Sequence, residues 1–137
     1  MIKVAGVWEQ GWNTPLSEYD LWAYPLRDFG VDEWYMTPVS GIDRPGITEL
    51  KSLDEVVSLN PGLVPVYVDE ASETDLRNFD HPEDVLYICG KASYSPWRAS
   101  GATGTSIRIK TIQDKGLLWP HQCMTLILYD RMLKSWQ

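Results

Sequence analysis

The sequence predicts an α/β fold in which a mainly parallel sheet carries helices on both faces. Short apolar segments of strand length alternate with segments of helical periodicity, and turn-forming residues separate them. The connections between strands are also long enough for crossovers, which parallel strands require. A chain of 137 residues is long enough for one hydrophobic core, so we expect one domain over residues 1–137.

The first strand is expected over residues 2–8, because Val and Ile dominate this segment and turn-forming residues follow it. A helix is expected next over residues 18–29, where apolar residues recur near the helical spacing. Ser17 is a candidate N-cap, and Gly30 is a candidate C-terminal cap. Pro25 lies inside this helix, so we expect either a kink at that residue or a later start.

Strands and helices continue to alternate through the middle of the chain. Residues 33–38 and 63–68 are rich in β-branched and aromatic residues, which predicts two strands. Residues 52–59 are expected to form a helix. A serine caps its start, and acidic residues in its first turn interact favourably with the helix dipole. Residues 74–77 predict a short helical turn, and the apolar run 85–89 predicts a strand that is covered on both faces.

The C-terminal part is expected to contribute one more strand and a long helix. Ile107 and Ile109 alternate with charged residues, which predicts a strand over residues 107–110. Apolar residues near helical repeats predict a helix over residues 119–136. Ligands of parallel sheets bind beyond the carboxyl ends of the strands, so functional residues are expected in the loops that follow them. These loops are residues 8–14, 69–73, 90–104 and 111–118.

Composition argues against several classes of protein. The net charge of −7 disfavours a protein that holds duplex nucleic acid by phosphate neutralisation alone. The longest apolar run is far shorter than the roughly 20 residues of a membrane span, and residues 1–7 lack the apolar region of a signal peptide. Cys89 and Cys123 lie in apolar segments and are expected to be buried free thiols in a reducing, cytoplasmic compartment. No P-loop, Rossmann fingerprint, zinc signature or serine-nucleophile motif occurs, and no metal site is expected.

Five segments resemble the SpoU/TrmH branch of the SPOUT, or α/β-knot, RNA methyltransferases. Residues 84–91 resemble the strand that ends in the family's glycine loop, and residues 107–110 resemble the strand that leads to its isoleucine-proline step. Residues 117–121 and 128–130 keep the spacing of its serine-leucine-asparagine and leucine-tyrosine-glutamate motifs. Residues 29–38 resemble its junction between a helix and a strand. The resemblance spans nearly the whole chain.

The resemblance implies a C-terminal trefoil knot around S-adenosylmethionine, which the family holds largely by main-chain groups. The residues that would bind the cofactor here are Val68, Gly90, Ile109, Leu117 and Leu118. Taken singly, the aliphatic residues could equally be core residues, and Gly90 could simply permit a turn. The resemblance also implies methylation of a ribose 2′-hydroxyl in tRNA or rRNA by a homodimer whose active sites are completed across two subunits.

Several positions depart from the family pattern. The family's helix-1 arginine, commonly assigned to activating the ribose hydroxyl, corresponds to Tyr24, and Arg27 is the nearest candidate for its role. Ala92 replaces a glutamate, and Trp119 and His121 replace an asparagine and a serine. Because imidazole titrates near neutral pH, His121 is a second catalytic candidate. The alternative is that His121 makes a structural hydrogen bond at the start of the last helix.

Aromatic, polar and basic side chains in two loops are candidates for binding RNA, because rings stack on bases and cations bind phosphates. The candidates are Trp12, Asn13, Lys91, Trp97 and Arg98. Packing or dimer contacts are the alternative for the aromatic residues. Three acidic residues after the third strand could bond ribose hydroxyls of the cofactor or form a solvated loop; they are Asp69, Glu70 and Glu73. The apolar face of the last helix is expected to form the dimer interface through Met124, Ile127, Leu128 and Met132.

Three hypotheses about function follow. The leading one is an RNA methyltransferase-like protein that uses S-adenosylmethionine. The second is a catalytically degenerate member of the same fold that binds RNA, a nucleoside or a protein partner, because the family's arginine, glutamate and asparagine are replaced. The third is an unrelated small nucleotide-binding α/β protein.

Overall fold

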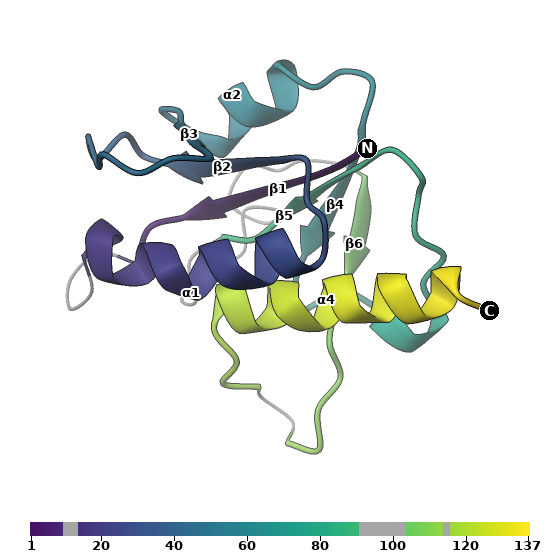
Figure 1. The fold of residues 1–137 in the computed structure, drawn as a ribbon. Coiled ribbons are helices and arrows are strands. Elements are labelled where there is room, and N and C mark those ends of the chain that lie inside the picture. The colour runs from purple at the N-terminus through teal and green to yellow at the C-terminus, as the bar shows by residue number, and fades with distance from the viewer. Residues whose placement is uncertain (10–13, 91–103, 114–115) are drawn as a thin grey trace.

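The computed structural model describes residues 1–9, 14–90, 104–113 and 116–137. Its centre is a six-stranded sheet in the order β3-β2-β1-β5-β4-β6 (Figure 1). The strands are β1 (Ile2–Val7), β2 (Glu33–Thr37), β3 (Ile47–Glu49), β4 (Val64–Val68), β5 (Val85–Ile88) and β6 (Thr105–Ile107). Each pair of neighbouring strands is parallel, which confirms the predicted parallel α/β class.

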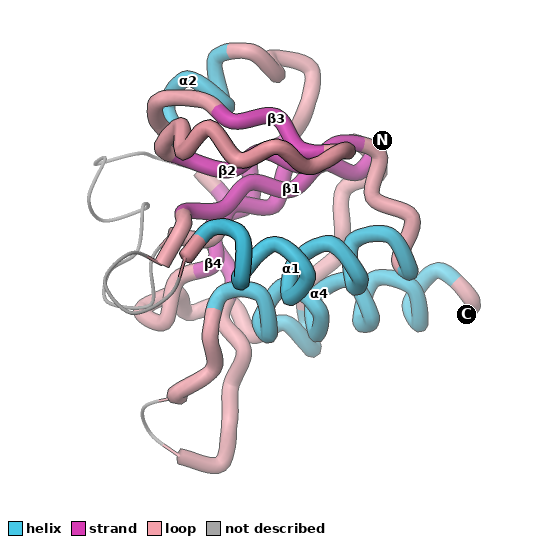
Figure 2. The backbone as a smooth tube through the Cα atoms, turned by 60° about the vertical axis from the view of Figure 1, so that its left-hand side comes forward, coloured by secondary structure: helices cyan, strands magenta, loops and turns pink. Residues whose placement is uncertain are grey.

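Helices cover both faces of this sheet. Helices α1 (Pro15–Asp28) and α4 (Pro120–Ser135) lie side by side on one face, and α2 (Leu53–Ser58) lies on the other (Figures 1 and 2). A single 3₁₀ turn, η1 (Leu76–Asn78), packs beside α4 between β4 and β5. No helix within the described ranges is long and apolar enough to cross a membrane.

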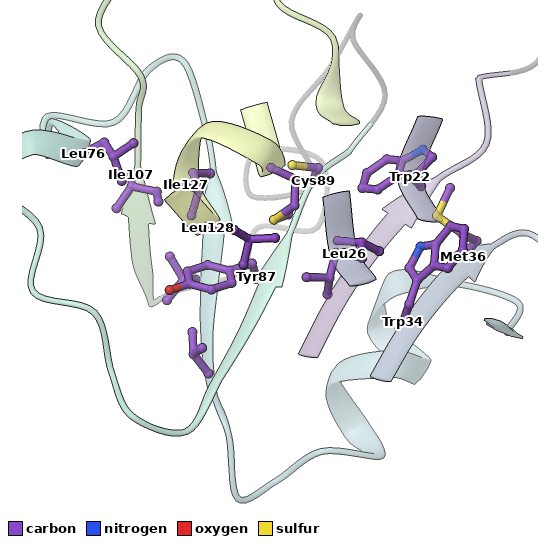
Figure 3. Close-up of a cluster of buried hydrophobic side chains, with 14 of the residues drawn as sticks. Trp22, Leu26, Trp34, Met36, Leu76, Tyr87, Cys89, Ile107, Ile127 and Leu128 are labelled. Carbon is purple, nitrogen blue, oxygen red and sulfur yellow. The ribbon is translucent and has the colours of Figure 1, made fainter. Parts of the chain in front are cut away.

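Two apolar clusters hold these layers together. On the α1 and α4 face, Trp34 and Met36 of β2 lie beside Trp22 of α1, and Ile127 of α4 belongs to the same cluster near Ile107 of β6 (Figure 3). On the other face, Val56 of α2 packs against a smaller cluster of sheet residues. The period-2 alternation of side chains along each strand sends neighbouring residues to opposite clusters.

Gly6 lets α1 lie close to the sheet. A Cβ atom at this position would lie 2.7 Å from Cη2 of Trp22 and 3.0 Å from Sδ of Met36. These separations are shorter than van der Waals contact, so only glycine leaves room for the indole over β1. The absence of a side chain at Gly6 therefore sets the distance between α1 and β1.

The start of α1 differs from the prediction. Thr14 is the N-cap, and its side chain accepts a hydrogen bond from the Ser17 N–H at 3.2 Å. Ser17 instead completes a capping box by accepting from the Thr14 N–H at 3.1 Å. The helix therefore begins earlier than expected and runs through Pro25. Its predicted end is confirmed, since Gly30 follows with a φ of 70°.

Two strands also differ from the prediction. The sequence analysis missed β3, because three residues are too few for a period-2 pattern to stand out. The last strand is β6 at Thr105–Ile107, where residues 107–110 had been expected. Arg108 makes only an isolated bridge to Asp75, so Ile109 lies beyond the strand. The other expected elements are present with small shifts at their ends.

The expected dimer face of α4 is wrong in three of its four residues. Met124, Ile127 and Leu128 are 1%, 0% and 2% exposed, because they belong to the core beneath α4. The exposed large apolar residues of α4 are instead Leu126, Tyr129, Leu133 and Trp136.

The C-terminal half of α4 is fastened to the connection between β4 and β5. The imidazole of His81 lies 2.7 Å from Oδ2 of Asp130 through Nε2 and 2.6 Å from the Tyr87 hydroxyl through Nδ1. Nζ of Lys134 forms a salt bridge with Asp130 at 2.8 Å and donates to the Phe79 carbonyl at 2.9 Å. These contacts join segments that are distant in sequence, so they fix α4 against the amino edge of the sheet.

Candidate cofactor-binding site

A pocket lies at the carboxyl edge of the sheet, where β4 and β6 end and α4 begins. Its walls are Val68, Asp69, Glu70, Arg108, Ile109, Thr111, Gln113, Gly116, Leu118 and Cys123. Because β4 and β6 are parallel neighbours, their carboxyl ends bring residues 68–70 and 108–109 together. This is the edge at which the sequence analysis placed the ligand site.

Three of the predicted cofactor residues meet in this pocket. Val68, Ile109 and Leu118 come from three segments and line it together. Leu117 lies next to the pocket, but its side chain is 89% exposed. Gly90 is buried just beyond β5, the strand next to β4, and is not among the lining residues. The predicted set is therefore gathered at one edge, although two of its members do not line the pocket with side chains.

Main-chain groups at this edge remain available for a ligand. Within the described ranges, no backbone hydrogen bond is made by Gly90, Ile109, Leu117 or Leu118. In contrast, the Asp69 N–H donates to the Ile107 carbonyl at 2.9 Å. Backbone N–H and C=O groups that lack a protein partner need water or a ligand. The arrangement can therefore bind a molecule that carries several hydrogen-bonding groups.

The acidic residues after β4 do not form a uniformly solvated loop. Asp69 is only 2% exposed, and its Oδ1 accepts a hydrogen bond from the Ala71 N–H at 2.9 Å. Glu70 is exposed and lines the pocket, whereas Glu73 lines a different hollow beside β6. Asp69 thus shapes the turn that presents Glu70 to the pocket.

Cys123 gives the pocket a neutral wall. Both cysteines of the chain are free thiols; Cys89 is buried, and Cys123 is partly buried. Burial, together with the carboxylate of Glu70, raises the pKa of the Cys123 thiol to about 11. At neutral pH the side chain is therefore an uncharged, weakly polar group beside the apolar side chains of the pocket.

His121 lies in the first turn of α4, on the side that faces α1. Its ring centroid is 6.3 Å from Trp22 and 5.8 Å from Trp119, edge to face in both pairs. Its Nδ1 is buried and makes no hydrogen bond with another described residue, so the alternative structural hydrogen bond is not seen at this nitrogen within the described ranges. Burial lowers the pKa of His121, and the carboxylate of Glu9 opposes that shift. The imidazole is therefore neutral at pH 7 and able to accept a proton.

The sequence analysis missed Glu18, a buried carboxyl group that contacts Trp22, the ring next to His121. Glu18 is 1% exposed and accepts hydrogen bonds from Nε1 of Trp22 at 3.1 Å and from the Glu9 N–H at 2.9 Å. Burial raises its pKa. The signal was an acidic residue four positions before Trp22, on the same face of the helix. Glu18 thereby ties the end of β1 to α1.

Arg27 lies far along α1 from this edge. Helix α1 runs antiparallel to the strands, so its last turn lies at the amino edge, near Asp32 and Glu33. Arg27 is exposed and lines a separate groove there with Trp34. The helix passes through Pro25 without turning Arg27 back toward the candidate pocket. Within one chain, the structure does not bring the two predicted catalytic residues together.

The predicted RNA-binding residues cannot be placed. Trp12, Asn13, Lys91, Trp97 and Arg98 lie outside the described residues. In the part of the chain that the structure does describe, no group of three or more His, Cys, Asp or Glu residues could hold a metal ion.

Comparisons with known proteins find likeness in structure only. No family model matches the chain, and no curated protein matches its sequence. Among solved structures, the SpoU methyltransferase AviRb from Streptomyces viridochromogenes, in complex with the cofactor AdoMet, matches with a TM-score of 0.78 at 15% identity. That match covers 99% of this chain and 58% of AviRb, so the chain spans little more than half of that protein.

Two further solved structures have the same fold. An RNA 2′-O ribose methyltransferase matches with a TM-score of 0.77 at 16% identity, over 99% of this chain and 57% of that one. A protein described for 2′-OH methylation of C/U34 on tRNA matches with a TM-score of 0.76 at 11% identity, over 99% of this chain and 92% of that one. At such identities the likeness establishes the fold. The chain thus has the α/β fold of the SpoU/TrmH-type RNA methyltransferases, as its sequence motifs predicted.

Proposed function

We propose that this protein is an S-adenosylmethionine-dependent methyltransferase that acts on a ribose 2′-hydroxyl of tRNA or rRNA. The observation that carries the proposal is the pocket at the carboxyl edge, where Ile109 and Leu118 offer apolar side chains and main-chain groups that make no hydrogen bond with another described residue. A solved protein of the same fold is described with AdoMet, and another is described as a 2′-O ribose methyltransferase.

The residues of the pocket fit this cofactor. Val68, Ile109 and Leu118 provide apolar walls suited to a purine ring, and the thiol of Cys123 is neutral. Main-chain groups near them that make no hydrogen bond with another described residue are available to the donors and acceptors of adenine. When bound, S-adenosylmethionine supplies a methyl group on a positively charged sulfur; transfer breaks that carbon–sulfur bond, forms a bond to the ribose oxygen and leaves S-adenosylhomocysteine.

In this proposal His121 takes the proton of the ribose hydroxyl. The buried imidazole is neutral at pH 7, which is the form that can act as a base. The Glu9 carboxylate is the charged group that acts on His121, and it favours the imidazolium that forms when the proton arrives. Glu9 follows the end of β1, and His121 lies in the first turn of α4, so both residues are at the carboxyl edge of the sheet. This position suits a substrate that binds beside the pocket.

We also propose a homodimer through the outer surface of α1 and α4. The two helices lie side by side (Figure 2), and exposed large apolar side chains lie on both or directly after α4. These residues are Leu16, Leu21, Tyr24, Leu126, Tyr129, Leu133 and Trp136. An exposed apolar patch of this kind is typical of an interface. The role predicted for Arg27 requires that this dimer bring it to the pocket of the other subunit, because within one chain it lines a groove at the opposite edge of the sheet.

The trefoil knot of the family is part of the proposal. The contacts of His81, Asp130 and Lys134 fix the position of α4 against the connection between β4 and β5. An experimental backbone trace in which α4 passes through a preceding loop is the direct test of the knot.

Calorimetric titration with S-adenosylmethionine and S-adenosylhomocysteine tests the cofactor. We expect affinities near micromolar, and no heat at millimolar ligand would contradict the proposal. Leu118→Arg places a charged side chain in the pocket and should weaken binding by at least about a hundredfold, because the arginine fills the apolar wall. Ile112→Arg is the matched control, since Ile112 is 100% exposed and does not line the pocket.

Transfer of a labelled methyl group to bulk tRNA and rRNA tests the activity. Digestion to nucleosides should yield a 2′-O-methylated nucleoside. A protein that binds the cofactor but transfers no methyl group to either RNA would instead be the catalytically degenerate member of the fold.

A further inference from the structure

Two opposite charges line the candidate pocket without neutralising each other. Glu70 follows β4, and Arg108 follows the neighbouring strand β6. Neither side chain makes an ion pair or hydrogen bond with another described residue. By contrast, Arg77, also near the end of β6, is paired with Asp75 at 2.9 Å. Among the described residues, the pocket thus presents one anion and one cation that have no charged partner.

The backbone that carries these charges is anchored. The Arg108 N–H donates to the Thr74 carbonyl, and the Arg108 carbonyl accepts from the Leu76 N–H, both at 2.9 Å. On the other side, buried Asp69 bonds the Ala71 N–H and so holds the turn that carries Glu70. Charged groups on a fixed backbone lose less freedom when they bind a ligand than groups on a free loop.

The Glu70 carboxylate acts on the wall that α4 contributes. It is the charged group that helps to raise the pKa of Cys123, a lining residue in the first helical turns of α4. Glu70 and Arg108 therefore frame the side of the pocket between the strand ends and α4.

This arrangement matches a zwitterion, and it rests on the proposed cofactor. The donor S-adenosylmethionine ends in an amino acid group with one carboxylate and one ammonium. We propose that Arg108 binds that carboxylate and Glu70 binds that ammonium, while the apolar walls hold the adenosine part. A guanidinium binds a carboxylate with paired, charge-assisted hydrogen bonds, and a carboxylate accepts from an ammonium in the same way.

Two ligands separate this inference from the proposed function. S-adenosylhomocysteine carries the amino acid group, whereas 5′-methylthioadenosine keeps the adenosine and sulfur but lacks that group. Calorimetry should show that the unaltered protein binds S-adenosylhomocysteine more tightly than 5′-methylthioadenosine. Arg108→Gln and Glu70→Gln should each lower the affinity for S-adenosylhomocysteine by about tenfold, because each substitution removes a charge-assisted contact. Both should leave the affinity for 5′-methylthioadenosine unchanged, which also shows that the variants are folded.

Matched controls come from charges outside the pocket. Glu73→Gln removes an exposed carboxylate three residues from Glu70, and Arg44→Gln removes an exposed guanidinium from the connection between β2 and β3. Neither should change the preference for S-adenosylhomocysteine. Equal losses in the controls would show a general effect of net charge and would overturn the assignment.

Each remaining outcome has a definite meaning. If the unaltered protein binds the two ligands equally, or if the variants keep its preference, the amino acid group is not recognised here and the inference is wrong. If Glu70→Gln weakens both ligands alike, Glu70 binds the ribose and the inference is also wrong. If neither ligand binds the unaltered protein, the proposed cofactor is wrong as well.

Discussion

The two histidines of this chain lie at opposite edges of one sheet and have opposite surroundings. His81, at the amino edge, uses both ring nitrogens, with Asp130 at 2.7 Å and the Tyr87 hydroxyl at 2.6 Å. His121, at the carboxyl edge, is held between two indole rings and has a buried Nδ1 without a partner.

The same contrast extends to the residues around them. Near His81, Asp130 and Lys134 pair with each other and with the chain across from them. At the carboxyl edge, Glu70 and Arg108 line the pocket without a charged partner in the part of the chain that the structure describes. Satisfied polar groups stabilise a fold, whereas free ones cost stability unless a ligand or water completes them. The amino edge therefore fastens the fold, whereas the carboxyl edge offers charged groups to a ligand.

The largest expected effect is on activity at the carboxyl edge. His121→Gln should lower the rate of methyl transfer to RNA by about a hundredfold or more, because glutamine cannot act as a base. Cofactor affinity by calorimetry and the thermal midpoint should change little. With unaltered protein, single-turnover rates should rise as pH increases through a pKa below 6.5, since burial lowers the pKa of His121. If the rate changes neither with the substitution nor with pH, His121 has no part in the mechanism.

The next effect is on stability at the amino edge. Asp130→Ala should lower the free energy of unfolding by about 2 kcal/mol, because it leaves His81 and Lys134 without their shared carboxylate. Asp20→Ala removes an exposed carboxylate from α1 and should cost less than about 0.5 kcal/mol. Urea unfolding followed by tryptophan fluorescence measures both. Equal losses in the two variants would show that the His81 network does not fasten α4.

The smallest effect is the pH dependence of stability. Burial lowers the pKa of His81 below 6.5, although Asp130 opposes the shift, so the unfolded chain binds more protons than the folded one. The contribution of His81 is therefore fully present above pH 6.5 and is lost as pH falls from there through the folded pKa. His81→Asn should flatten the loss of stability between pH 7 and pH 5 relative to unaltered protein. Unfolding curves across that range decide the point, and parallel losses in both proteins would contradict it.

Local patterns were sufficient to predict most of the fold. The apolar run at Val85–Ile88 and the helical periodicity of α4 are properties of neighbouring residues, so they could be recognised without a partner. The short strand β3 and the N-cap Thr14 were not predicted. A pairing of three residues, and the choice between two capping groups three residues apart, depend on the surrounding structure. The side of α4 that is buried also depended on tertiary packing, which placed Met124 in the core.

The sequence by itself determined the parallel α/β class, because the alternation of strand and helix patterns is local. The family resemblance pointed to Val68, Ile109 and Leu118, and the structure brings these three residues to one pocket. Only the tertiary structure decided that Arg27 lies at the other edge and that Glu70 and Arg108 share a pocket unpaired. Distances between side chains from different elements arise when the layers pack, and no spacing along the chain encodes them.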